Sequence, residues 1–272
     1  MTISAIGWPA GWTRQRRSQA TIVTASLSLL VALWVAASFI ALAPAPIGPN
    51  AKFFAEGMVV TVELTIVAGL VGVALGLLAA LGKTSRLLPL RWLSGFYIWV
   101  IRGTPLLVQL FLVYYGLAQF DAVKQSVLWP WLGSAWFCAI AAFSVNTCAY
   151  TIEILHGAMR AVPAGEIEAA RAMGMSRGVL LRRVVLPAAF RRMLPAYGNE
   201  AILMLQATSL ASTVTLMDIT GAARTMNSTY YLPFEAFLTA AALYLVLTTM
   251  LVGLFHAAER RWLMPWQTRM SR

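Results

Sequence analysis

Few side chains in this sequence are of the types that perform covalent chemistry, and their spacing does not suit a catalytic or metal centre. His156 and His256 lie far apart near the ends of apolar stretches, without a nucleophile or a set of metal ligands beside them. Cys138 and Cys148 share one apolar stretch, where buried thiols are expected rather than a disulfide or a zinc site. We therefore expect no catalytic residue, no metal site and no enzyme activity in this chain.

A tripeptide at Gly82, Lys83 and Thr84 resembles the end of a nucleotide-binding P-loop. That motif requires its first glycine at the position of Leu77, and the nearby Gly76 falls one residue too early. We expect this chain to bind no cofactor, so any ATP and Mg²⁺ that drive its activity must be held by a partner subunit.

The stretch from Arg160 to Pro187 is polar and rich in arginine within an otherwise apolar sequence. Pro163 suits the first turn of a helix, and Gly174 suits the left-handed residue that ends one. Ser176 can cap a second short helix, which Pro187 would stop. The pattern predicts two short helices with a sharp bend between them.

The first of these helices, at about residues 164–173, carries a narrow apolar ridge of Ile167, Ala170 and Met173. Charged residues flank the ridge, and they are Glu166, Glu168 and Arg171. Such a ridge fits a groove on another protein. A helix lying on the membrane surface, or an ordinary cytoplasmic loop, is the alternative interpretation.

The composition places the chain in a membrane, because 60% of its residues are hydrophobic and 11% are charged, against about 25% charged in soluble domains. About six apolar stretches approach the roughly 20 residues that a spanning helix needs. They are residues 21–43, 58–82, 93–118, 131–155, 196–217 and 234–256. Since backbone groups in lipid must be paired within the segment, we predict an all-α polytopic protein.

Glycines of the second stretch favour close approach between membrane helices. They are Gly69, Gly72, Gly76 and Gly82.

The 21 basic residues exceed the 10 acidic ones, and alternate segments between the spans carry most of them. The positive-inside rule then places residues 83–91, residues 160–192 and both termini in the cytoplasm. The tails at residues 1–20 and 261–272 are therefore expected to be cytoplasmic. The charge sets the topology of a multi-pass protein in contact with membrane lipid, and it predicts no nucleic-acid partner because it is divided among separate segments.

Glu168-Ala169-Ala170, followed by Gly174 and later by Leu186-Pro187, resembles the EAA loop of permease subunits of bacterial ABC importers. In that family the loop is a coupling helix that sits in a cleft of the ATPase subunit. The resemblance implies a set of residues that couple the chain to a cytoplasmic ATPase dimer. They are Glu166, Glu168, Ala169, Ala170, Gly174, Leu186 and Pro187.

Further motifs resemble the polar amino-acid branch of these permeases, at residues 61–65, 101–110 and 114–117. Residues 145–150, 197–200 and 258–263 look like M-type permeases for histidine, lysine, arginine and ornithine, and residues 209–218 are closer to octopine and nopaline permeases. The resemblance implies a type I importer domain at residues 55–260, with residues 160–187 as its EAA coupling loop. The helix at 21–43 is an addition, since M-type subunits typically have five spans.

Ionisable side chains inside a span are costly, so each should have a partner or line a cavity. The candidates are Glu63, Arg102, Glu153, Glu200, Asp218 and Glu235. Glu63, Glu153 and Glu235 lie near span ends, where headgroups can solvate them.

Glu200 and the adjacent Asn199 are predicted to project into the helix bundle. A carboxylate there could pair with a cationic substrate or with another helix, and Arg102 could donate to carbonyls freed near Pro105. Gln206, Thr208 and Ser209 could hydrogen-bond a zwitterion or pack between helices. The candidate substrate path therefore comprises Asn199, Glu200, Gln206, Thr208, Ser209 and Arg102.

Sequence and resemblance together predict a permease subunit of an ATP-driven ABC importer in the bacterial inner membrane. Its predicted cargo is polar amino acids, in particular histidine, arginine, lysine and ornithine, or opines. The resemblance implies a second homologous permease subunit and a periplasmic amino-acid-binding protein, which would dock on loops at residues 44–57, 119–130 and 218–233. The alternatives are an ATP-independent secondary transporter, disfavoured because no inverted repeat is evident, and a membrane scaffold protein.

Overall fold

The computed structural model describes residues 45–83 and 87–262, and all regular structure in that part of the chain is helical. The long helices are α2 (Ala51–Lys83), α3 (Leu88–Gly103), α7 (Ala135–Arg160), α10 (Leu186–Ala207), α11 (Ile219–Tyr230) and α12 (Pro233–Trp262). The short ones are α4 (Leu106–Phe111), α5 (Asp121–Lys124), α6 (Trp129–Leu132), α8 (Ala164–Ala172) and α9 (Arg177–Leu180). The predicted tail 1–20, the predicted helix 21–43 and most of the tail 261–272 lie outside the described residues.

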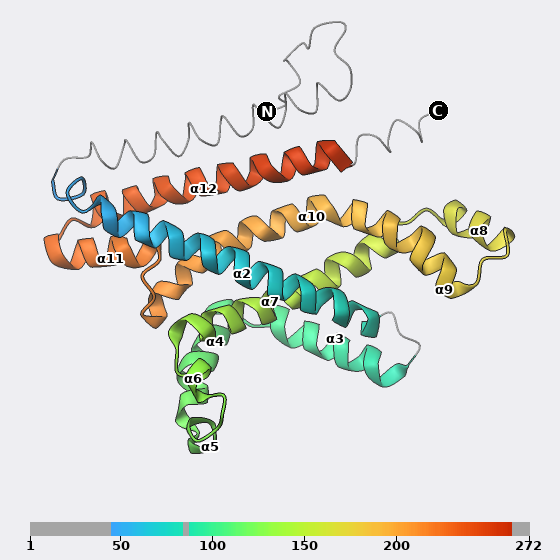
Figure 1. Cartoon of the computed structure of the whole chain (residues 1–272), viewed down its shortest axis with the longest axis horizontal. Helices are drawn as coiled ribbons and strands as arrows, with labels where there is room; N and C mark the ends of the chain where they lie inside the picture. The colour runs from blue at the N-terminus through green and yellow to red at the C-terminus, as the bar shows by residue number, and fades with distance from the viewer. Residues whose placement is uncertain (1–44, 84–86, 263–272) are drawn as a thin grey trace, which may run out of the picture.

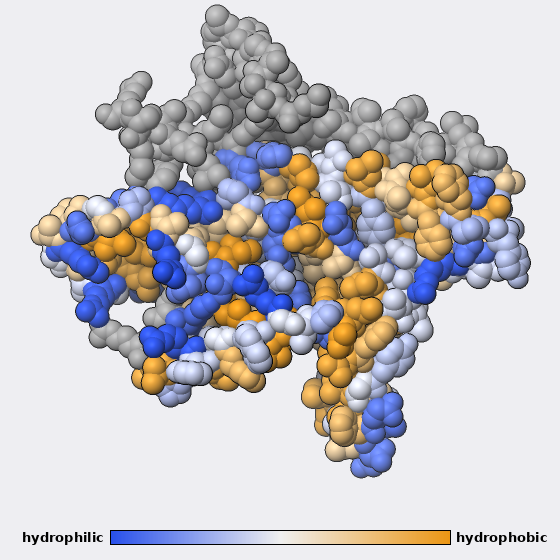
Figure 2. Space-filling model, turned by 180° about the vertical axis from the view of Figure 1, so that it is seen from behind, coloured by the Kyte–Doolittle hydropathy of each residue, from blue (hydrophilic) through white to orange (hydrophobic). Residues whose placement is uncertain are grey.

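The long helices lie side by side, with α8 and α9 at one end of the molecule and α11 at the other (Figure 1). In the projecting segment, hydrophobic side chains cover the part nearer the long helices, and hydrophilic side chains appear at the tip around α5 (Figures 1 and 2). Hydrophilic side chains are frequent at the end that carries α8 and α9 (Figure 2). This distribution suits a protein whose flanks face lipid and whose α8–α9 end faces water.

Three helices, α2, α7 and α12, are each long and apolar enough to cross a membrane. Two bent pairs raise the number of possible spans in the described residues to five. The pairs are residues 88–103 with 106–119, bent by 103°, and residues 177–214 with 219–230, bent by 45°. These five correspond to five of the predicted stretches.

The prediction of one continuous third span is wrong, because the backbone leaves the helix between α3 and α4. Thr104 is extended, and Pro105 follows it without an N–H to donate. The buried Gln109 side chain donates to the carbonyl of Ile101 at 2.7 Å and to Oγ1 of Thr104 at 2.9 Å. Its Oε1 accepts from Nδ2 of the buried Asn146 on α7 at 3.1 Å. The Gln109 amide thus gives a hydrogen-bond donor to the Ile101 carbonyl, which the break leaves without a backbone partner. Its bond to Asn146 connects the break to α7.

The predicted stop at Pro187 is also wrong. Pro187 lies in the first turn of α10, where its missing N–H removes no hydrogen bond. The backbone reaches it from α9 through a π-helical turn, Leu181–Val185. The fifth span therefore starts ten residues before the predicted position 196, at Leu186, and it ends in a 3-10 helix, Thr208–Val214.

Residues 218–233, predicted as an outer loop, form α11 and its flanking turns. The fully buried Asp218 caps this helix, accepting from the N–H of Gly221 at 2.9 Å and of Thr220 at 3.3 Å. The hydroxyl of Tyr244 on α12 donates to the same carboxylate at 2.9 Å. Asp218 is thus a structural cap that joins α11 to α12.

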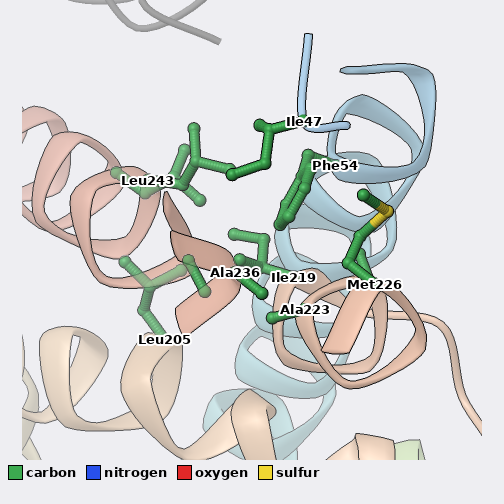
Figure 3. Packing of buried hydrophobic residues seen from close by; sticks show 11 residues of the cluster. Ile47, Phe54, Leu205, Ile219, Ala223, Met226, Ala236 and Leu243 are labelled. Atoms are coloured by element: carbon green, nitrogen blue, oxygen red, sulfur yellow. The ribbon is translucent and has the colours of Figure 1, made fainter. Parts of the chain in front are cut away.

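A hydrophobic cluster surrounds this junction (Figure 3). Side chains from α2, α10, α11 and α12 and from the turn before α2 meet there, and those labelled are Ile47, Phe54, Leu205, Ile219, Ala223, Met226, Ala236 and Leu243. All are buried, so α11 is packed against α2, α10 and α12 through this cluster.

Helices α2 and α7 pack against each other through the predicted small residues. A Cβ atom at Gly72 would lie 2.6 Å from Cβ of Thr147 and 2.9 Å from the carbonyl oxygen of Ser144. At Gly69 the nearest atom would be the Tyr197 hydroxyl, at 4.0 Å. Gly72 therefore permits a close approach that no larger residue would, and Gly69 does not have this role.

We expect Gly72→Ala to destabilise the protein by about 1–3 kcal/mol, because the added methyl group overlaps α7. Gly69→Ala is the matched control, since its methyl group enters open space. Thermal unfolding of the purified protein in detergent measures the difference. Equal melting temperatures for the two variants would contradict the close packing at Gly72.

Asp218→Ala should cost about 1 kcal/mol for the lost cap and about 1–3 kcal/mol for the stranded Tyr244 hydroxyl. Adding Tyr244→Phe to Asp218→Ala should then cost little more, because the hydroxyl has already lost its acceptor. Melting temperatures of the two single variants and the double variant test this coupling. Strictly additive losses would show that the two side chains act independently.

Candidate coupling loop and transport path

The turn between α8 and α9 has the geometry that the sequence predicts. Gly174 has a φ of 76°, in the left-handed region. Its N–H donates to the carbonyl of Arg171 at 2.9 Å, and the N–H of Met175 donates to the carbonyl of Ala170 at 3.2 Å. These two bonds form a Schellman motif, which ends α8 and reverses the chain.

The predicted apolar ridge of α8 does not lie on one exposed face. Ala170 is buried, as is Leu180 on α9, whereas the side chain of Met173 is 69% exposed. Glu168 and Ala169 are exposed as well. The surface that α8 offers to another protein is therefore centred on Glu168, Ala169 and Met173. Ala170 points inward because α8 folds back toward α9.

Glu166 lies on the inner side of α8 and pairs with α10. Its Oε1 is 3.4 Å from Nη2 of Arg192, and Nη1 of Arg192 donates to the carbonyl of Ala188 at 3.2 Å. The two side chains are only 24% and 18% exposed, so water and salt screen this pair less than a surface pair.

A second ion pair, between Lys83 and Glu153, joins the end of α2 to α7. Glu153 also lines a cavity of 330 Å³ between α7 and α10, on whose other side lie Arg192 and Ala196. The sequence predicts Glu153 two residues before a span end at 155, but α7 continues to Arg160, so Glu153 lies two turns inside the helix.

Two of the predicted path residues, Arg102 and Glu200, interact through their charges without direct contact. The guanidinium of Arg102 lies 5.0 Å from the ring centroid of Tyr150, which is a cation–π contact. Glu200 is buried on α10, and Arg102 is near enough to attract its carboxylate without forming an ion pair with it. Carbonyls at the nearby break accept from Gln109 instead of Arg102.

Asn199 does not project into the bundle with Glu200, because neighbouring residues on a helix point in different directions. It is exposed, and so are Pro195, Leu203 and Gln206, which recur at intervals of four, four and three residues. These positions form one stripe along α10, which we call the α10 stripe.

Thr208 and Ser209 lie neither beside Glu200 nor on the α10 stripe. The buried Thr208 hydroxyl donates to the carbonyl of Leu205 at 2.7 Å, and the carbonyl of Ser209 accepts from Ser212 at 2.9 Å. Both interactions are local to the 3-10 helix, and they give these residues a structural role there.

Sequence reasoning missed Gln109 and Asn146. The signal that could have found them is one amide side chain inside each of two apolar stretches. An amide in lipid must find a hydrogen-bond partner.

Residues 72–264 match the family described as "Binding-protein-dependent transport system inner membrane component". The octopine transport system permease protein OccM of Rhizobium meliloti is 47% identical over 203 residues, which cover 75% of this chain and 83% of OccM. The histidine/lysine/arginine/ornithine transport system permease protein HisM of Salmonella typhimurium is 45% identical over 208 residues, covering 76% and 88%.

Solved structures agree with this fold. A crystal structure of an amino acid ABC transporter with histidines superposes with a TM-score of 0.72 at 38% identity, covering 78% of this chain and 95% of the other. An inward-facing structure of the MetNI methionine ABC transporter gives a TM-score of 0.62 at 18% identity, which supports the fold alone. This chain belongs to the family of binding-protein-dependent transport system inner membrane components.

Proposed function

We propose that this chain is the permease subunit of an ABC importer for basic amino acids or opines, driven by a separate ATPase. The buried carboxylate of Glu200, inside a fold that matches an amino acid transporter, is the observation that supports the substrate class. A carboxylate in a low-dielectric bundle favours a cationic ligand group, because it lacks the solvation that water gives.

The orientation follows from the ends of the helices. Helices α2, α7 and α12 end on the side of the molecule where α8 and α9 lie (Figure 1), and that side carries Lys83 and Arg160. The positive-inside rule makes this side cytoplasmic. The opposite side, with α11 and the segments at 44–57 and 119–130, would then receive the periplasmic binding protein.

Coupling would run through α8. Glu168, Ala169 and Met173 would enter the ATPase cleft, and the ATPase dimer would hold the ATP and Mg²⁺. Leu186 and Pro187 begin α10 after the loop, so α10 is the first long helix that follows the loop, and it carries Glu200.

A second permease subunit would cover the α10 stripe. Asn199 and Gln206 are polar side chains on a helix that crosses lipid, where an amide needs a partner or water. A transport path between two subunits would supply a protein partner and water for these amides. It would also place them opposite a zwitterionic substrate.

Gly174→Ala tests the coupling loop. An alanine at positive φ costs about 1–2 kcal/mol, so co-purification of the ATPase and uptake of labelled arginine should fall together, by roughly tenfold. Gly165→Ala is the control, because both positions have open space and only Gly174 has a positive φ. Retention of both ATPase and uptake by Gly174→Ala would refute the docking role of this turn.

Glu200→Gln tests the substrate class. Arginine uptake should fall by about tenfold or more through loss of a desolvated charge partner, while the melting temperature changes little. Glu63→Gln removes an exposed carboxylate on α2 and serves as the control. A lowered melting temperature with an unchanged KM for arginine would instead make Glu200 a structural residue.

A further inference from the structure

We propose that the ion pair between Glu166 and Arg192 is the strut through which the docked α8 moves α10. Both would be positioning residues, which act on transport by fixing one helix relative to another. This inference rests on the proposed function, since it presumes an ATPase seated on α8.

The backbone between α8 and α10 is poorly suited to transmit a displacement of α8 to α10. It passes through the left-handed Gly174, the single turn of α9 and the π-helical turn Leu181–Val185. Glycine has wide conformational freedom, and π-helical turns are marginal, so a force on α8 would be absorbed along this route. The direct bond from Glu166 to Arg192 bypasses all three elements.

The strut is held at its α10 end by more than one bond. Arg192 donates to the carbonyl of Ala188, one turn earlier in the same helix, while its other terminal nitrogen faces Glu166. A guanidinium anchored on its own backbone presents a fixed charge, so the entropy lost in forming the ion pair is reduced. Partial burial of both side chains further limits screening.

The start of α10 borders an open groove, while α7 is held against α2. Helix α7 is fixed to α2 by the close packing at Gly72 and by the Lys83–Glu153 pair. Between α7 and the start of α10 lies the 330 Å³ cavity, lined by small residues that include Gly157, Ala161 and Ala196. Ala189 and Met193 of α10 are buried in the same hydrophobic cluster as Ile152 of α7, so a shift of α10 along the direction of the strut would move this packed interface as a unit.

The test uses the assembled transporter in proteoliposomes, with its ATPase, partner permease and binding protein, and labelled arginine as the substrate. Arg192→Gln lies on α10, outside the coupling residues, and should leave the ATPase bound and its basal hydrolysis intact. Glu166→Gln removes the other half of the ion pair. Arginine transported per ATP hydrolysed should fall by roughly threefold to tenfold, the range that coupling networks show. The exchanged pair, Glu166→Arg with Arg192→Glu, should recover most of that ratio, as should Arg192→Lys alone.

Arg91→Gln is the control, because it removes an exposed arginine on α3 at the same end of the molecule. An unchanged transport ratio in Glu166→Gln and Arg192→Gln, with the ATPase bound, would overturn the strut and leave the proposed function standing. The strut is also overturned if the neutral variants reduce the ratio but neither the exchanged pair nor Arg192→Lys restores it. If the unaltered chain fails to retain an ATPase at all, the proposed function itself fails.

Discussion

A membrane-spanning chain must pair every backbone polar group within itself, because hydrocarbon offers no water to replace a missing hydrogen bond. Two departures from a straight helix in the described residues meet that requirement with specific side chains. Gln109 and Asn146 serve the break between α3 and α4, and Asp218 serves the start of α11. The break between α3 and α4 and the bend before α11 are therefore fixed by side chains, and they set the positions of the helices that follow.

The helix pair α2–α7 and the start of α10 differ in their surroundings. Helices α2 and α7 meet at Gly72 with no space for a methyl group, and Lys83 with Glu153 closes their common end. The start of α10 borders an open groove beside α7, and its Ala189 and Met193 are buried in the same cluster as Ile152 of α7. A transporter that alternates between two states needs such a division, because packed interfaces move as units rather than deforming.

The coupling loop and the candidate path share one helix. The chain enters α10 directly from the loop, and α10 carries both the buried Glu200 and the α10 stripe. Events at an ATPase and events at a substrate site would thus act on one rigid element, which is the physical condition for coupling between distant sites. Neither site requires a long chain of intermediate contacts.

The sequence alone determined the all-α membrane class, five of the spans described here and the left-handed turn at Gly174, because apolar length and glycine chemistry are local properties. It could not predict which side chains hold the break in the third span or which side chain pairs with Glu166. Those outcomes depend on partners far away in sequence, such as Asn146 for Gln109 and Arg192 for Glu166. Only the tertiary structure decides which polar groups meet, since a buried group is stable only beside its partner.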